Sequence, residues 1–70
     1  MATFDALIRD LTNNPQVFTN KNGVKQVYVG KAVLVDMGED VLVSPPNGKG
    51  IMVPLHGSVE EVKRRINHLL

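Results

Sequence analysis

The chain has 70 residues, eight basic against seven acidic side chains, and no cysteine. A chain of this length has room for one domain with a thin core, whose stability is typically about 3–5 kcal/mol. The absence of cysteine excludes disulfides and thiolate zinc sites as supports. The near-neutral charge favours neither nucleic acid nor a membrane surface as a partner. We therefore expect a single domain over residues 1–70 that gains stability from a second copy or a partner protein.

The sequence also carries signals about location. Its first residues, Met-Ala-Thr, include neither the basic nor the apolar segment of a secretory signal. No apolar run approaches the ~20 residues that a bilayer-spanning helix requires. These observations predict a cytoplasmic protein without membrane contact. A small free-standing protein of this kind would also suit an accessory role in a phage or another mobile element.

The segment after Thr3 predicts a short helix. Its apolar residues, Phe4, Leu7, Ile8 and Leu11, recur at the spacing of one helical stripe. Thr3 is a suitable N-cap, because its hydroxyl can accept a hydrogen bond from a free backbone N–H of the first turn. The run Asn-Asn-Pro that follows ends the helix, since a residue before proline avoids helical backbone angles.

Between residues 16 and 55, short β-forming runs alternate with turn residues such as Asn-Gly and Gly-Lys. The expected strands cover residues 16–19, 24–29, 32–37, 41–44 and 51–55. Connections this short join antiparallel neighbours, because parallel strands need crossovers of a dozen or more residues. We predict an α+β fold with an antiparallel sheet of three to five strands and a helix at each end. A small SH3-like barrel with the same terminal helices is the alternative.

The last helix has the clearest start signal. Ser58 and Glu61 have the spacing of a capping box, in which the serine hydroxyl accepts a hydrogen bond from the backbone N–H three residues on. Val59, Val62, Ile66 and Leu69 then form an apolar stripe. The basic residues 63–65 include arginines four residues after Glu60 and Glu61, and this order favours ion pairs on a solvated face.

Alternation along the strands assigns their side chains to two faces. The expected core face consists of Val33, Val35, Val41, Val43, Ile51, Val53 and Leu55. The opposite face then holds Ala32, Leu34, Leu42 and Met52, which are also apolar. An antiparallel sheet that is apolar on both sides needs a second cover. Either the helices cover both faces, or the strands close into a barrel, or both helices lie on one face and these four residues bind a partner or a second copy. We favour the third interpretation.

The sequence offers no persuasive catalytic or cofactor site. The Asn-Gly-Lys-Gly turn at 47–50 lacks the first glycine and the following Ser or Thr of a phosphate-binding loop, and a strand follows it in place of a helix. The acidic turn at 36–40 lacks the ligand spacing of a calcium loop. His56 and His68 have no carboxylate or serine placed beside them. We expect a protein that is not an enzyme and has no cofactor, metal or small-molecule substrate.

Nucleic-acid binding is the alternative to a protein partner. Lys21, Lys25, Lys31 and Lys49 lie in or beside the predicted turns, and Tyr28 lies between two of them. Basic residues around an aromatic side chain are the minimum that single-strand binding requires. The expected function is nevertheless a non-catalytic interaction or regulatory protein that binds a protein partner or itself.

The segment from Val41 to Ile66 contains a strand, an Asn-Gly turn, a second strand and a helix that begins Ser-Val-Glu-Glu-Val. This layout resembles that of several small bacterial proteins, including the FlbD-like flagellar family. The resemblance covers the C-terminal third to half of the chain and lies in turn and cap residues. It therefore implies a local arrangement of strands and helix and no particular function.

Overall fold

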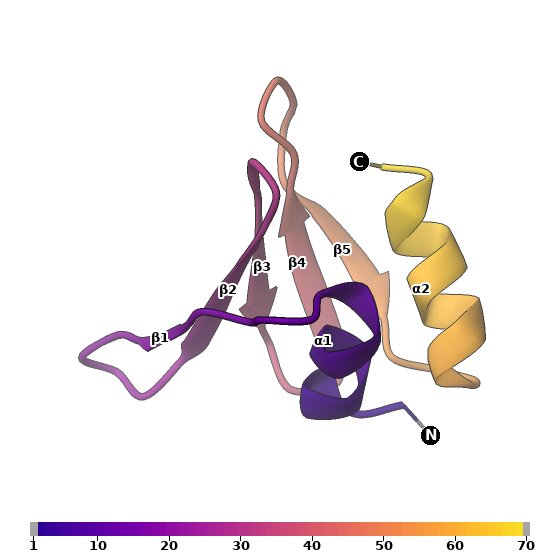
Figure 1. Ribbon diagram of the computed structural model, residues 1–70, viewed down its shortest axis with the longest axis horizontal. Helices are drawn as coiled ribbons and strands as arrows, with labels where there is room; N and C mark the ends of the chain where they lie inside the picture. Colours follow the sequence, from indigo (N-terminus) through magenta and orange to yellow (C-terminus); the bar gives the residue numbers. More distant parts are fainter. Residues whose placement is uncertain (1, 70) are drawn as a thin grey trace.

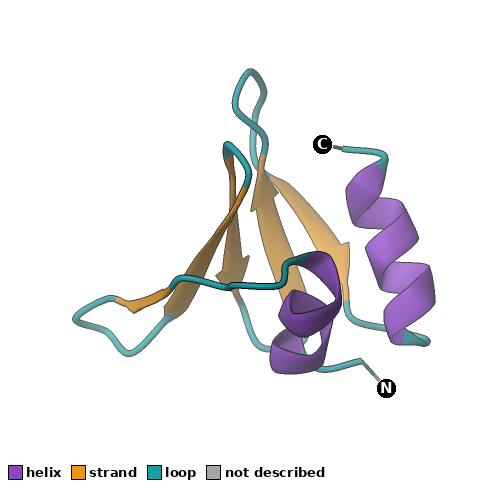
Figure 2. Cartoon of the chain, viewed as in Figure 1, coloured by secondary structure: helices purple, strands orange, loops and turns teal. Residues whose placement is uncertain are grey.

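The computed structural model describes residues 2–69 and arranges them in two layers, a five-stranded antiparallel sheet and two helices on one side of it (Figure 1). The elements are α1 (Phe4–Leu11), β1 (Val17–Thr19), β2 (Lys25–Val29), β3 (Ala32–Asp36), β4 (Asp40–Ser44), β5 (Ile51–Pro54) and α2 (Val59–Asn67). Figure 2 shows the same chain with the strands and helices distinguished by colour. The predicted α+β class is confirmed, with the largest strand number in the expected range.

Each strand pairs with the next one along the chain, so the sheet order is β1-β2-β3-β4-β5. Within residues 2–69 the two edge strands, β1 and β5, do not pair with each other, and the alternative of a closed barrel is not formed. The tightest connection joins β2 to β3 through Gly30 and Lys31, and Gly30 has a φ of 62°. A two-residue hairpin turn needs a positive φ at its first central residue, which glycine adopts without strain.

Both helices begin at the predicted caps. The Thr3 hydroxyl accepts a hydrogen bond from the Ala6 N–H at 3.2 Å, and the Ser58 hydroxyl accepts one from the Glu61 N–H at 3.3 Å. The predicted stripes face the core: α1 buries Phe4, Leu7 and Ile8, and α2 buries Val62 and Ile66. Two- to three-turn helices are marginal in water, so their contact with the sheet stabilises them.

The core lies between the helices and one face of the sheet, which we call the inner face. The central residues of this face are fully or almost fully buried: Val27, Ala32, Leu34, Val41, Val43 and Val53. Val17 and Ile51, which lie on the same face in the two edge strands, are about half exposed. All of the buried side chains except Ala32 pack with the helical stripes and with Leu55 in one apolar cluster. Burying a Val or Leu side chain contributes roughly 1.5–3 kcal/mol. The inner face is therefore the main source of stability in this small molecule.

The predicted division of the strands between two faces is wrong for β3. Val33 pairs with Ser44 and Val35 with Leu42, so these two valines lie on the face opposite the core. Four residues, 37–40, separate the paired residues Asp36 and Val41. Because this number is even, odd-numbered residues of β4 pair with even-numbered residues of β3 and share a face with them. The prediction places odd-numbered residues of both strands on one face, and a one-residue change of register moves every side chain of a strand to the other face.

The edge strand β5 ends in a proline. The Leu55 N–H donates a hydrogen bond to the Glu39 carbonyl at 2.9 Å, toward the interior of the sheet. Because hydrogen-bonding groups alternate along an antiparallel strand, position 54 points toward the open edge. Pro54 has no N–H to present there, and such positions are where prolines are tolerated in sheets.

In the part of the chain that the structure describes, neither helix has the length and apolar character needed to cross a membrane.

Candidate interaction surface

The face of the sheet opposite the helices, which we call the outer face, is defined by the strand register. Directly paired residues on antiparallel strands point to the same side. The outer face consists of Phe18, Gln26, Tyr28, Val33, Val35, Asp40, Leu42, Ser44, Met52 and Pro54. Only Asp40, at the start of β4, is charged, and all the others but Gln26 and Ser44 are apolar or aromatic. The outer face thus has the composition of a surface that packs against protein.

The outer face is nevertheless open to solvent. Phe18, Tyr28 and Met52 are exposed by 51%, 50% and 48%. Val33, Val35 and Leu42 are half-buried by their neighbours within the sheet. A half-exposed aromatic side chain leaves roughly 100 Å² of its surface in water. The molecule therefore carries a contiguous apolar patch of several hundred Å², which is large for a protein of this size.

Two aromatic rings form the β1–β2 side of the outer face. Phe18 on β1 and Tyr28 on β2 meet edge to face, with ring centroids 5.7 Å apart and an interplanar angle of 77°. Sequence reasoning identified Tyr28 and missed Phe18, because β1 is short and its pairing with β2 is not visible in a propensity pattern. The Asn-Gly turn that joins the two strands was the available signal, since it predicts that they form a hairpin.

On the β4–β5 side of the outer face, the packing of Leu42 depends on a glycine. A Cβ atom at Gly50 would lie 3.0 Å from Cδ1 of Leu42 and 3.3 Å from the Ser44 hydroxyl oxygen. The Leu42 side chain therefore lies directly against the backbone at position 50. This contact partly buries Leu42, which pairs with Met52 across β4 and β5.

The four residues predicted to bind a partner do not share a face. Leu42 and Met52 lie on the outer face, while Ala32 and Leu34 lie in the core with exposures of 2% and 0%. The prediction that both helices cover one face and leave an apolar face open is correct. The membership of that open face is corrected by the register of β3: Val33 and Val35 take the places expected for Ala32 and Leu34.

Opposite charges lie at the two ends of the sheet. Lys31 in the β2–β3 turn and Lys49 in the β4–β5 loop lie at one end, the upper end in Figure 1. Glu39 and Asp40, in the β3–β4 turn and at the start of β4, lie at the opposite end. Glu39 and both lysines are exposed, and Asp40 is half-buried. The apolar outer face is thus flanked by a basic end and an acidic end.

The lysines predicted to bind nucleic acid are not gathered into one strip. Lys25 lies on the helix side of the sheet, where its Nζ is 3.4 Å from Oδ1 of Asp5 on α1. Lys21 lies in the β1–β2 turn, at the end of the sheet opposite Lys31 and Lys49. Tyr28 lies on the outer face. The structure therefore separates the five residues into four locations.

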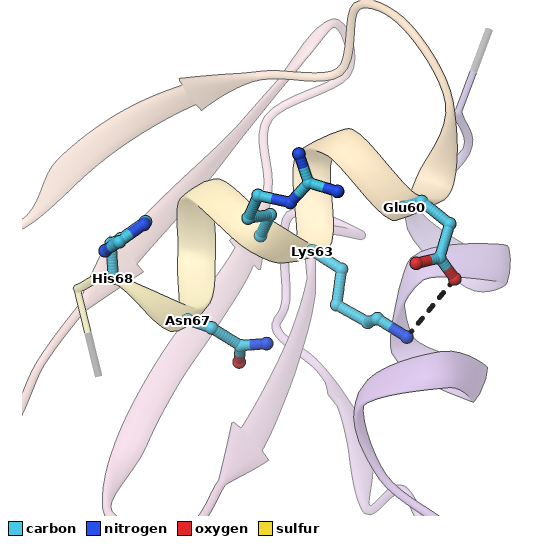
Figure 3. Close-up of a pocket in the computed structure, with 5 residues that line it drawn as sticks. Glu60, Lys63, Asn67 and His68 are labelled. Carbon is cyan, nitrogen blue, oxygen red and sulfur yellow. Dashed lines mark ion pairs between the residues drawn. The ribbon is translucent and has the colours of Figure 1, made fainter.

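A shallow hollow on the solvent side of α2 is lined by Glu60, Lys63, Arg64, Asn67 and His68. Figure 3 shows the Glu60 and Lys63 side chains pointing toward one another, away from Asn67 and His68. Nζ of Lys63 lies 3.5 Å from a Glu60 carboxylate oxygen and 3.8 Å from one of Asp10. These carboxylates neutralise the lysine and Arg64 is exposed, so the hollow lacks the unpaired, buried charge that would hold an anion.

Metal ligands are not clustered in residues 2–69, where no three His, Asp or Glu side chains come together. Comparison with known protein families, with curated proteins and with solved structures finds no match to this chain. The resemblance of the C-terminal third to half of the chain to the FlbD-like family is therefore not supported by a family match.

Proposed function

We propose that this chain is a small, non-catalytic interaction protein that binds another polypeptide, either a regulatory partner or a second copy, through its outer face. The observation that carries the proposal is the combination of a largely apolar face, charged only at Asp40 on its rim, with half-exposed Phe18, Tyr28 and Met52. Antiparallel sheets that face water normally alternate apolar inner residues with polar outer ones. A contiguous apolar patch of this kind marks an association site.

The core also supports an interaction role. In residues 2–69 no polar or charged side chain is buried, so the described part of the chain has no enclosed site with convergent polar groups. Binding and catalysis of small substrates depend on such enclosed sites. An exposed aromatic and methionine surface instead matches the side chains that are enriched in protein–protein interfaces.

Site-specific photo-crosslinking tests this proposal. A photoreactive phenylalanine analogue at Met52 should give covalent adducts with a polypeptide in the cells that express the protein. The same analogue at Arg64, on the exposed side of α2, serves as a matched control. We expect the Met52 adducts to disappear when Leu42→Asp is added, because the charge disrupts an apolar contact. Equal adduct yields from the two positions would contradict the proposal.

Nucleic-acid binding is the second candidate, and one observation favours it. Phe18 and Tyr28 present two adjacent aromatic rings on an open sheet face, which can stack on unpaired bases. The separation of the lysines weakens it. If single-stranded nucleic acid is the ligand, the combined change of Lys21, Lys31 and Lys49 to Gln should lower the salt dependence of binding by about one unit of slope per lost phosphate contact. Fluorescence anisotropy with a single-stranded oligonucleotide at low salt measures this, and absence of binding excludes the candidate.

A further inference from the structure

We propose that the outer face binds the outer face of a second copy, in a two-fold dimer whose axis runs between the two sheets and perpendicular to their strands. This inference rests on the proposed function and names its partner. Three features of the described residues support this dimer: the placement of charges at the ends of the sheet, the lack of charge at the centre of the outer face, and the area available for contact.

The charge placement determines the orientation. Rotation about an axis perpendicular to the strands reverses the strand direction and keeps the strand order, so the β3–β4 turn of one copy faces the opposite end of its partner's sheet. That end carries the β2–β3 turn on one side and the β4–β5 loop on the other. Glu39 and Asp40 of one copy then lie between Lys31 and Lys49 of the second copy, and the symmetry repeats this contact at the other end. Both ends of the dimer become electrostatically complementary.

The other simple two-fold arrangement is disfavoured by the same charges. An axis parallel to the strands would place Glu39 and Asp40 over their own counterparts, and Lys31 and Lys49 over theirs. Like charges placed opposite each other oppose association. Lys21 lies outside this pattern, in the β1–β2 turn that extends beyond the edge of the sheet (Figure 1).

The outer face itself is compatible with self-contact. Its one charged residue is Asp40, at the acidic end of the sheet, so two copies bring no like charges together at the centre of the interface. Stacked sheets lie about 10 Å apart with their strands aligned to within about 30°. Gln26 and Ser44 are uncharged polar side chains on this surface, and both can donate and accept hydrogen bonds across a two-fold axis.

The surface area that two outer faces could bury is close to the smallest area found in specific dimers. Phe18, Tyr28 and Met52 each leave roughly 100 Å² exposed, and the half-buried residues of the outer face add to this. Two copies together would bury on the order of 1,000 Å², which is near the lower limit of specific interfaces. A dimer of this size should be reversible, with measurable dissociation on dilution.

The test uses the full chain and two charge-swapped variants, followed by sedimentation velocity at low salt over a range of concentrations. Glu39→Lys with Asp40→Lys makes both ends basic, and Lys31→Glu with Lys49→Glu makes both ends acidic. We expect each variant alone to dimerise at least about tenfold more weakly than the unmodified chain, and an equimolar mixture to regain dimerisation. Glu60→Lys on α2 is the control for a charge change outside the interface and should leave dimerisation unchanged.

The outcomes separate the inference from the proposed function. An unmodified chain that stays monomeric up to millimolar concentration overturns the dimer, while Met52 crosslinks to a different polypeptide would still support the proposed function. A dimer that survives Leu42→Asp in the folded state does not use the outer face and overturns the inference. A dimer that neither charge-swapped pair weakens has a different orientation, which also overturns it. Failure of the proposed function itself would appear as a monomer without crosslinks at Met52.

Discussion

The inner and outer faces of this sheet are both rich in apolar side chains, and only one of them is covered. Val41 and Val43 on the inner face are fully buried, while Leu42 between them lies on the outer face. Two helices, each about 10 Å wide, cover a five-stranded sheet that is about 19 Å across. Both helices are therefore used on one face. The apolar character of a strand shows that it needs cover on both sides, and it does not show that the chain can supply that cover.

The largest expected difference between the faces is the effect of a buried charge. Leu34→Asp places a carboxylate at a fully buried position of the inner face and should unfold the molecule, with a loss of more than about 4 kcal/mol. Leu42→Asp, on the outer face, should leave the chain folded in dilute solution, with a loss of about 1 kcal/mol. Circular dichroism with urea denaturation measures both. A folded Leu34→Asp variant would show that the inner face is not the core.

The second comparison concerns the start of α2, the helix that covers part of the inner face. Ser58→Ala removes the hydroxyl that accepts a hydrogen bond from the Glu61 N–H and should lower the free energy of unfolding by about 1 kcal/mol. Ser58→Asp keeps an acceptor and serves as the matched control. An unchanged urea midpoint for the alanine variant would show that Ser58 does not cap α2 in solution.

The third prediction measures how much the outer face contributes to the stability of the monomer. A double-mutant cycle between Phe18→Leu and Tyr28→Leu should give a coupling free energy of about 0.5 kcal/mol, at the low end for aromatic pairs because both rings are half-exposed. The measurement requires dilute protein, so that association does not contribute. Zero coupling would mean that the two rings do not meet in solution.

The smallest expected effect concerns the polar contact between β2 and α1. Lys25→Met removes the ion pair with Asp5, in which both side chains are largely exposed. The loss of stability should be about 0.2–0.5 kcal/mol at low salt and should vanish near 1 M salt, where exposed charges are screened. A loss that is equally large at both salt concentrations would mean that the aliphatic part of Lys25 packs against α1.

The sequence predicted the elements well and one register poorly, and the difference has a physical basis. The caps at Thr3 and Ser58 and the apolar stripes are local signals within one helix, so a single sequence contains them. The faces of β4 and β5 were predicted correctly: Val41 and Val53 are paired and share the inner face. Which residues of β3 face the core depends on the number of residues in the β3–β4 turn. Strand propensity does not predict that number.

The existence of an open apolar face could be predicted from the sequence, and its residues could be predicted only in part. Leu42 and Met52 were predicted from alternation within their strands, and Phe18 was missed because it enters the surface through pairing with β2. The charge arrangement was also missed. Lys31, Glu39 and Lys49 lie in three different turns of the sequence. Which turns share an end of the sheet is known only when the strand order is known.

Pro54 affects what happens when copies of this chain crowd together. A sheet edge with free N–H groups can recruit another edge without limit, which is how fibrils grow. β5 lacks one of those donors, and the other edge strand, β1, is only three residues long. Both margins of the sheet are thus poor templates for elongation. A rise in concentration should consequently increase finite assemblies formed through a face of the sheet, and the chain should resist conversion into an insoluble filament.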